Sequence, residues 1–230
     1  MSSVAIITAR GGSKRIPRKN VKSFMGRPML AYAIGAARES KLFDEVMVST
    51  DDEEIAAIAR SEGAAVPFLR SAATASDFAT TADVLSEVLS NYGERGQTFD
   101  EFCCIYPCVP FLTGEILRTA HEVFAQPETD ALMPVVRYSF PIQRAVKLNG
   151  VGYLEYREPE NASRRSQDLE PTYHDVGMFY FVRTDAFLAK RSVVAGRTRL
   201  FEMPEERVQD IDTMDDWRMA EMKFKLLNHA

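Results

Sequence analysis

The sequence predicts an α/β domain in which a mostly parallel β-sheet is flanked by helices. Three observations favour this class. Strand-sized apolar runs alternate with segments that repeat apolar residues at helical spacing. The first such run, residues 4–9, is apolar or β-branched throughout, as in a strand buried on both faces, and two glycines follow it closely. A polar stretch interrupts the alternation between residues 138 and 175.

The first half of the chain reads as consecutive strand and helix units. Strands are expected at residues 4–9, 46–50, 65–68 and 102–106. Helices are expected at residues 29–37, 81–92 and 113–124, where apolar residues recur three or four positions apart. Pro28 suits the first turn of the first helix, and Asp51 is placed to cap another helix with Glu54 three residues on. This alternation predicts right-handed crossovers between parallel strands.

The second half is less regular. Residues 131–156 are strand-rich and residues 157–173 are polar and charged, which indicates an inserted hairpin arm or lid over about 138–175. Residues 176–182 return to a buried strand, and a final helix begins at about Thr213. Because no interdomain linker is visible, the 230 residues are expected to form one domain.

Composition argues against several classes of protein. The formal net charge is −5, which disfavours a general nucleic-acid or membrane-surface role. The longest apolar runs are too short to cross a bilayer and the start lacks a signal-peptide pattern, so a cytoplasmic protein is expected. The cysteines lack the spacing and histidine partners of structural zinc and are expected to be buried thiols: Cys103, Cys104 and Cys108. No role is expected for His121 or His229.

Positive charge is concentrated after the first strand. Residues 10–22 contain no acid and carry Arg10, Lys14, Arg15, Arg18, Lys19 and Lys22. Glycines there let backbone N–H groups turn toward an anion while Arg and Lys supply charge, which suits a triphosphate. The loop also follows a parallel strand, where ligands bind in open α/β sheets. It matches neither the P-loop nor the dinucleotide pattern, and the alternative is a solvated basic loop.

Two acids near the C-terminus form a second candidate site. Asp210 and Asp212 are two positions apart in a segment expected to be extended, so their side chains point to one side. Both could then bind one hard cation that also contacts phosphate oxygens. The alternative is that Asp212 only caps the final helix.

The polar stretch holds a third candidate site. Arg164 and Arg165, with the nearby Ser166 and Gln167, could hold a carboxylate and hydroxyl groups, as binding of a sugar acid requires. The alternative is a mobile polar arm on the surface. His174 lies beside Asp175 and is either an oriented base or half of a structural pair.

Taken together and in this order, these segments resemble the cytidylyltransferases that make CMP-activated sialic acids. The resemblance rests on residues 9–20, 49–56 and 210–217 and covers nearly the whole chain. Residues 139–145, 165–169 and 173–180 resemble the pseudaminic acid branch of that family. Tyr106 stands where N-acylneuraminate relatives usually carry the glutamine of a Gln-Pro-Thr-Ser-Pro segment, which bears on the sugar and not on the reaction.

The resemblance implies a Rossmann-like nucleotidyltransferase core and a homodimer in which the inserted arm reaches the partner's active site. The implied reaction transfers CMP from CTP to the anomeric C2 hydroxyl of pseudaminic acid, with Mg²⁺ as cofactor and pyrophosphate as second product. Legionaminic or N-acetylneuraminic acid is the alternative acceptor. More distant alternatives are a sugar 1-phosphate, the eight-carbon acid of lipopolysaccharide, or a silent nucleotide-binding module, which would need a broken basic loop or acid pair.

The resemblance also assigns roles to individual residues. Lys19, Asp210 and Asp212 would be catalytic, and the two aspartates would hold the metal. The nucleotide would be bound by Arg10, Gly11, Gly12, Ser13, Lys14 and Asn20, with Arg70 and Thr81 helping to select the pyrimidine. The sugar would be bound by Gln143, Arg144, Arg165, Gln167 and His174.

Overall fold

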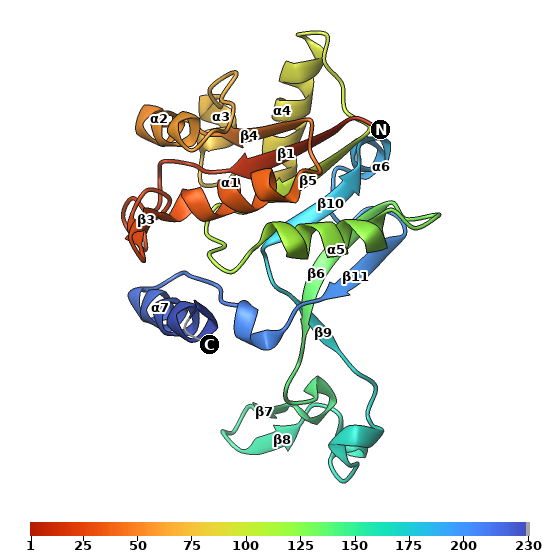
Figure 1. The fold of residues 1–230 in the computed structure, drawn as a ribbon. Coiled ribbons are helices and arrows are strands. Elements are labelled where there is room, and N and C mark those ends of the chain that lie inside the picture. Colours follow the sequence, from red (N-terminus) through yellow and green to blue (C-terminus); the bar gives the residue numbers. More distant parts are fainter. Residues whose placement is uncertain (229–230) are drawn as a thin grey trace.

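A seven-stranded sheet organises the molecule (Figure 1). Its strand order is β11-β6-β10-β5-β1-β4, and β9 pairs with β6. The strands that share one direction are β1 (Ser3–Thr8), β4 (Glu45–Ser49), β5 (Glu101–Ile105), β6 (Ala131–Arg137) and β11 (Thr198–Glu202). Two run against them, β9 (Tyr173–Asp175) and β10 (Phe179–Arg183). This computed structural model describes residues 1–228, so His229 lies outside it, and the expected α/β class is confirmed.

Helices cover both faces of the sheet, so β1 is buried on both sides. Its Ala5 and Ile7 pack in a cluster with α1 (Met29–Ser40), α2 (Glu53–Ser61) and α5 (Gly114–Phe124). Its Val4 and Ile6 pack on the other face with α4 (Thr81–Gly93) and α6 (Thr184–Lys190). The uniform apolar run that predicted a doubly buried strand is therefore explained by packing on two layers.

A third apolar cluster joins the C-terminal helix to the start of the chain. Helix α7 (Met214–Asn228) packs its Trp217 edge-on against Phe24, in the hairpin of β2 (Ser23–Phe24) and β3 (Arg27–Pro28). Ile16, from the basic loop, and Ile211, from the segment between the two aspartates, are both buried in this cluster. Apolar packing thus holds the two polar candidate sites beside each other.

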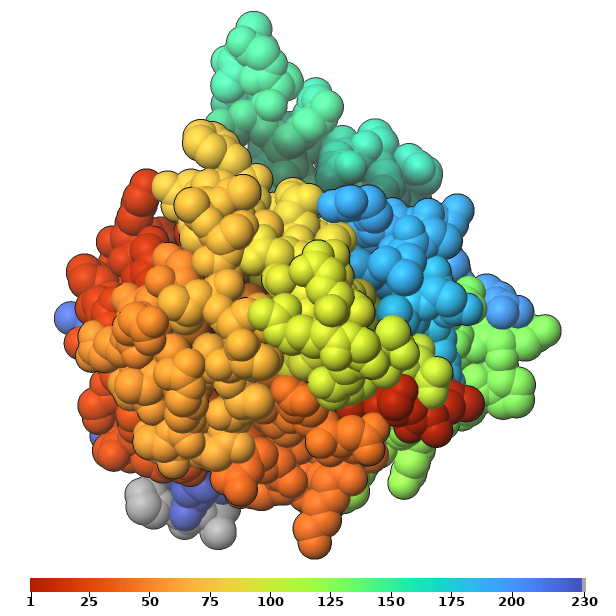
Figure 2. Space-filling model, turned by 90° about the horizontal axis from the view of Figure 1, so that it is seen from above, coloured from red at the N-terminus to blue at the C-terminus, as the bar shows by residue number. Residues whose placement is uncertain are grey.

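The predicted arm leaves the sheet between β6 and β9. It contains β7 (Val146–Leu148), β8 (Leu154–Tyr156) and three 3-10 turns, Ile142–Arg144, Pro159–Asn161 and Ser166–Asp168. Figure 2 shows this segment projecting beyond the outline of the rest of the molecule. Several of its large apolar side chains are exposed, including Phe140 at 87%, Leu148 at 74% and Val151 at 77%.

Three local expectations were wrong. Residues 65–68 form no strand, and only Ala65 bridges to Met47, because Pro67 has no N–H for a longer ladder. Helix α2 is capped by Asp52, whose Oδ1 accepts from the N–H of Ile55 at 3.0 Å, and not by Asp51. The strand expected from residue 176 begins at Phe179, after a glycine with a positive φ.

Within residues 1–228, no helix is long and apolar enough to span a membrane. The cysteines are free thiols; Cys103 and Cys104 are buried as expected, whereas Cys108 is partly buried. Remaining short elements are α3 (Ala72–Ala75), which contacts α4, and the 3-10 turn Glu205–Arg207 that precedes the aspartate segment.

Candidate active site

A cavity of about 630 Å³ opens at the carboxyl ends of β1 and β5. Thr8, the last residue of β1, and Tyr106, which follows β5, line it. Nine of the residues predicted from the sequence line the same cavity: Arg10, Ser13, Lys14, Lys19, Asn20, Arg70, Thr81, Asp210 and Asp212. The fold therefore brings together the predicted nucleotide-binding and metal-binding residues from three distant parts of the chain.

Hydrogen bonds within the basic loop fix its shape. Asn20 is buried, and its Nδ2 donates to the carbonyl of Arg10 at 2.8 Å. The hydroxyl of Ser13 donates to the carbonyl of Ile16 at 2.7 Å. Asn20 and Ser13 thus support the loop from within, and the long side chains of Arg10 and Lys14 supply its charge.

The start of helix α2 holds the loop from outside. Gly11 donates its N–H to the carboxylate of Asp51 at 2.9 Å, and a Cβ on Gly11 would lie 2.8 Å from Oδ2 of Asp52. Only glycine fits this close approach without displacing Asp52. Arg18 bonds to Asp52 and Glu54, and the hydrogen bond from Arg18 lowers the pKa of Asp52. Gly11 and Gly12 were predicted to bind nucleotide, but neither lines the cavity.

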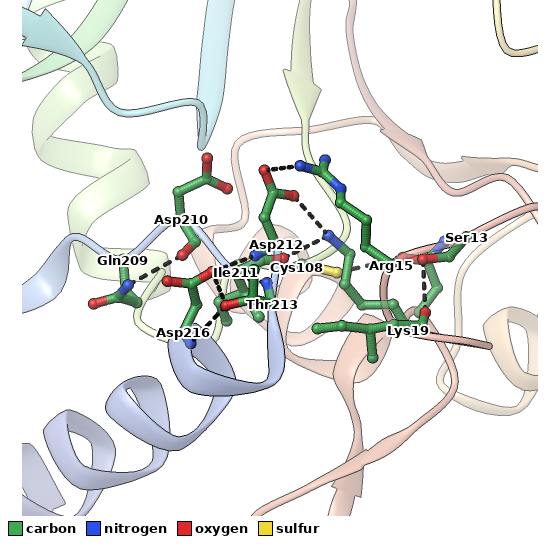
Figure 3. Close-up of polar contacts among 12 residues, drawn as sticks. Ser13, Arg15, Lys19, Cys108, Gln209, Asp210, Ile211, Asp212, Thr213 and Asp216 are labelled. Atoms are coloured by element: carbon green, nitrogen blue, oxygen red, sulfur yellow. Dashed lines mark hydrogen bonds and ion pairs between the residues drawn. The ribbon is translucent and has the colours of Figure 1, made fainter.

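The two aspartates project to the same side of an extended segment (Figure 3). Ile211 between them is buried, which fixes this alternation. Asp212 pairs with Arg15 at 2.7 Å and lies 3.6 Å from the amine of Lys19. Lys19 also donates to the carbonyl of Ile211 at 2.6 Å, so it ties the basic loop to the aspartate segment.

Helix α7 is capped without Asp212. The hydroxyl of Thr213 accepts from the N–H of Asp216 at 3.2 Å, and the Asp216 carboxylate accepts from the N–H groups of Asp212 and Thr213. The hydrogen bond from the Thr213 hydroxyl lowers the pKa of Asp216. The alternative that Asp212 only caps this helix is therefore wrong, and its carboxylate faces the cavity.

The aspartate pair fits a divalent cation. Both side chains offer hard carboxylate oxygens, the donors that Mg²⁺ prefers, and they point to one side beside the cavity. Within residues 1–228, no group of three or more His, Cys, Asp and Glu side chains could hold a metal ion. A cation bound here would need further ligands from phosphate oxygens and water, as Mg²⁺ sites commonly have.

The wall of the cavity also includes Arg70, Thr81 and Tyr106. Arg70 is buried and donates to the carbonyl of Ser49 at 2.8 Å; burial lowers its pKa. The hydroxyls of Thr81 and Tyr106 are 3.2 Å apart, and the Tyr106 ring packs edge-on against Tyr180. Tyr106 thus belongs to the wall of the cavity, where its hydroxyl engages a predicted nucleotide-binding residue.

The predicted sugar-binding residues do not line this cavity. Gln143 donates to the carbonyl of Glu170 at 2.9 Å, and Arg165 pairs with Asp168 at 2.9 Å, both within the arm. Arg144, Gln167 and His174 are also exposed. Asp175 accepts from the hydroxyl of Tyr180 at 2.8 Å, so the hydrogen bonds of its carboxylate do not involve the neighbouring His174.

Sequence reasoning missed two charged residues of the cavity. Arg15 was counted in the basic cluster without a role, yet it pairs with Asp212. Asp77 pairs with both Arg10 and Lys14. Asp77 lies in a short irregular segment, where no periodicity signals which side chains turn inward; its only signal was that it lies between Arg70 and Thr81.

A Rossmann-like sheet with a basic loop after its first strand, beside two aspartates that line the same cavity, defines a nucleotidyltransferase. The family model for cytidylyltransferases matches residues 4–223, and the chain belongs to this family. The expectation drawn from the motifs is confirmed. Cytidylyltransferases generally use a divalent metal ion, which agrees with the donor set of the aspartate pair.

Two named relatives match over nearly their full length. The chain is 38% identical to a pseudaminic acid cytidylyltransferase of Campylobacter jejuni, covering 100% of this chain and 98% of that protein. It is 31% identical to a CMP-N,N'-diacetyllegionaminic acid synthase of Legionella pneumophila, covering 100% and 99%. The solved structure of CMP:2-keto-3-deoxy-manno-octonic acid synthetase with CTP superposes with a TM-score of 0.70 at 19% identity over 100% of both chains, which supports the fold.

Proposed function

We propose that this cytidylyltransferase transfers CMP from CTP to the anomeric C2 hydroxyl of pseudaminic acid and releases pyrophosphate. The observation that carries the proposal is the cavity in which a basic loop faces an aspartate pair. The choice of sugar is supported by the full-length similarity to pseudaminic acid cytidylyltransferases. The legionaminic acid relative is 31% identical and an N-acylneuraminate cytidylyltransferase is 33% identical, so legionaminic and N-acetylneuraminic acids are the alternative acceptors.

In the proposed reaction the C2 hydroxyl attacks the α-phosphorus and pyrophosphate leaves in line. The protein holds the reactants and neutralises the charge that grows on the phosphoryl oxygens. Arg10 and Lys14 would hold the phosphates, and Lys19, fixed between the loop and Ile211, would contact the α-phosphate. Mg²⁺ held by Asp210 and Asp212 would neutralise phosphate charge in the transition state.

The part of the cavity wall formed by Arg70 and Thr81 would hold the cytosine. Arg70 is buried and anchored to Ser49, which keeps its guanidinium at a fixed place in the wall. Thr81, hydrogen-bonded to Tyr106, would meet the base edge beside it. Groups held in this way would lose little conformational freedom when they bind a pyrimidine, which would lower the cost of binding.

The arm would act on a second copy of the chain. Its predicted sugar-binding residues lie outside this chain's own cavity, and its apolar side chains are unusually exposed. A homodimer would cover those side chains and bring Arg165 and His174 to the partner's cavity. The variant Leu148→Asp is then expected to run as a monomer in light scattering and to lose sugar-dependent turnover.

Leu226→Asp is the matched control, because Leu226 is 73% exposed on α7, outside the arm. It should leave both the mass and the turnover unchanged. A Leu148→Asp protein that keeps the wild-type mass, or a wild-type protein that is monomeric at assay concentration, would contradict this role of the arm.

The sugar is tested by pyrophosphate release from CTP and Mg²⁺ with each acceptor in a separate reaction. Pseudaminic, legionaminic and N-acetylneuraminic acids and the eight-carbon acid are compared at equal concentration. Turnover with pseudaminic acid alone supports the proposal, and preference for another acid overturns the sugar assignment. No turnover with any of the four would overturn the proposed reaction.

A further inference from the structure

Asp77 is paired with Arg10 and Lys14, the two side chains that the proposed function assigns to the triphosphate. Its Oδ1 accepts from Nη1 of Arg10 at 2.8 Å, and its Oδ2 accepts from Nζ of Lys14 at 2.5 Å. One carboxylate thus engages both long cations near the start of the basic loop. Hydrogen bonds from Lys14 and Arg10 lower the pKa of Asp77, so the carboxylate is charged at neutral pH.

The segment that carries Asp77 is anchored at both ends. At its start, Glu87 of α4 accepts from the N–H of Ser71 at 2.8 Å and from the hydroxyl of Thr74 at 2.6 Å. At its end, Thr80 forms a capping box with Asp83 of the same helix. Between these anchors Ser76, Asp77 and Ala79 line the cavity, and Asp77 links this segment to the basic loop.

Little free energy is needed to break the two ion pairs. The side chains of Arg10, Lys14 and Asp77 are 40%, 77% and 44% exposed, so water screens each pair, and such surface pairs contribute little stability. A triphosphate brings several negative charges to the same two donors. The triphosphate cannot bind Arg10 and Lys14 while Asp77 remains paired with them, because phosphate and carboxylate oxygens would then be adjacent like charges.

We propose that Asp77 competes with the phosphates of the nucleotide for Arg10 and Lys14. This inference rests on the proposed function of the basic loop. Asp77 then weakens CTP binding, and after the transfer it takes the two cations back and promotes release of pyrophosphate. It contacts no reacting atom; its role is to set the affinity of the site for polyphosphate.

The test uses Asp77→Asn, which removes the charge and keeps the shape. Binding of inorganic pyrophosphate, CTP and cytidine is measured by calorimetry in EDTA, so that the basic loop alone is probed. Pyrophosphate and CTP are expected to bind about threefold to tenfold more tightly to the variant, as for the loss of one partly screened charge. Cytidine, which has no phosphate, should bind with unchanged affinity. Steady-state inhibition by pyrophosphate should strengthen in the same proportion.

Asp185→Asn is the matched control, because this exposed aspartate does not line the cavity and its loss changes the net charge equally. Its pyrophosphate affinity should equal that of the wild type. Unchanged or weaker pyrophosphate binding by Asp77→Asn would overturn the competition, weaker binding showing that Asp77 instead positions the loop. If wild-type protein and a Lys14→Gln variant bind pyrophosphate equally, the proposed function of the loop itself fails.

Discussion

Replacing Asp212 by asparagine is expected to lower kcat strongly while the protein stays folded. The side chain is 32% exposed and pairs with Arg15 and Lys19, so these ion pairs contribute at most about 1 kcal/mol. In a chain of 230 residues that corresponds to a fall of at most about 4 °C in Tm. The cap of α7 remains, because Thr213 and Asp216 form it without the Asp212 carboxylate.

The effect on activity should be far larger. A fixed group that acts on the transition-state charge typically contributes a factor of about 100 to 1,000 in kcat. Pyrophosphate release from CTP at saturating Mg²⁺ and sugar measures this loss, and thermal unfolding of the same samples measures Tm. The matched variant is Thr213→Ala, which removes the helix cap. Its free energy of unfolding should fall by about 1 kcal/mol and its Tm by a similar amount, while its kcat should not change.

Two outcomes would refute this reasoning. If Asp212→Asn kept more than about a tenth of the wild-type kcat, its charge would not be part of the catalytic site. If Thr213→Ala lost activity to the same extent, the position of α7 would be what matters and not the carboxylate at residue 212.

Two further predictions concern stability. In Gly114→Ala, the new Cβ would lie 2.7 Å from the backbone of Glu39, so α5 must move away from α1. The free energy of unfolding should fall by about 1–3 kcal/mol, which urea unfolding measures. An unchanged urea midpoint would contradict this close packing of the two helices. Arg18→Gln should remove stability that depends on pH. Because Arg18 lowers the pKa of Asp52 below 3.8, their pair contributes fully above that value and is lost as pH falls through the lowered pKa of the folded state. The variant should therefore be less stable than the wild type at neutral pH and equally stable in strong acid, and a difference that persists in acid would show another cause.

The sequence predicted best where one pattern has one physical meaning. The apolar run at residues 4–9 predicted a strand buried on both faces of the sheet. The spacing of apolar residues after Pro28 predicted the helix that begins at Met29. It failed where a single residue decides. Pro67 prevents a ladder, and Asp52 rather than Asp51 satisfies the helix terminus. An apolar run also carries no direction, so the antiparallel orientation of β10 could not be predicted.

The site shows the same division. Charge and spacing suggested the basic loop and the acid pair as separate ligand sites, and only the resemblance to a family joined Lys19 and Asp212, which lie 3.6 Å apart in the structure. The contacts between the basic loop and the aspartate segment depend on the packing of Ile16 and Ile211 in one cluster. No sequence motif predicts this packing. Asp77 and Arg15 were therefore missed as partners of predicted residues that line the cavity.

The stem of the arm has a consequence for how this chain can change. Arg137 and Tyr173 are paired neighbours in the β6 and β9 ladder, so the chain leaves and re-enters the sheet at adjacent points. The intervening residues can lengthen, shorten or be exchanged as a cassette without altering the spacing of the strands that carry the cavity. Acceptor recognition, where it depends on this cassette, can diverge while the nucleotide-binding half stays constant.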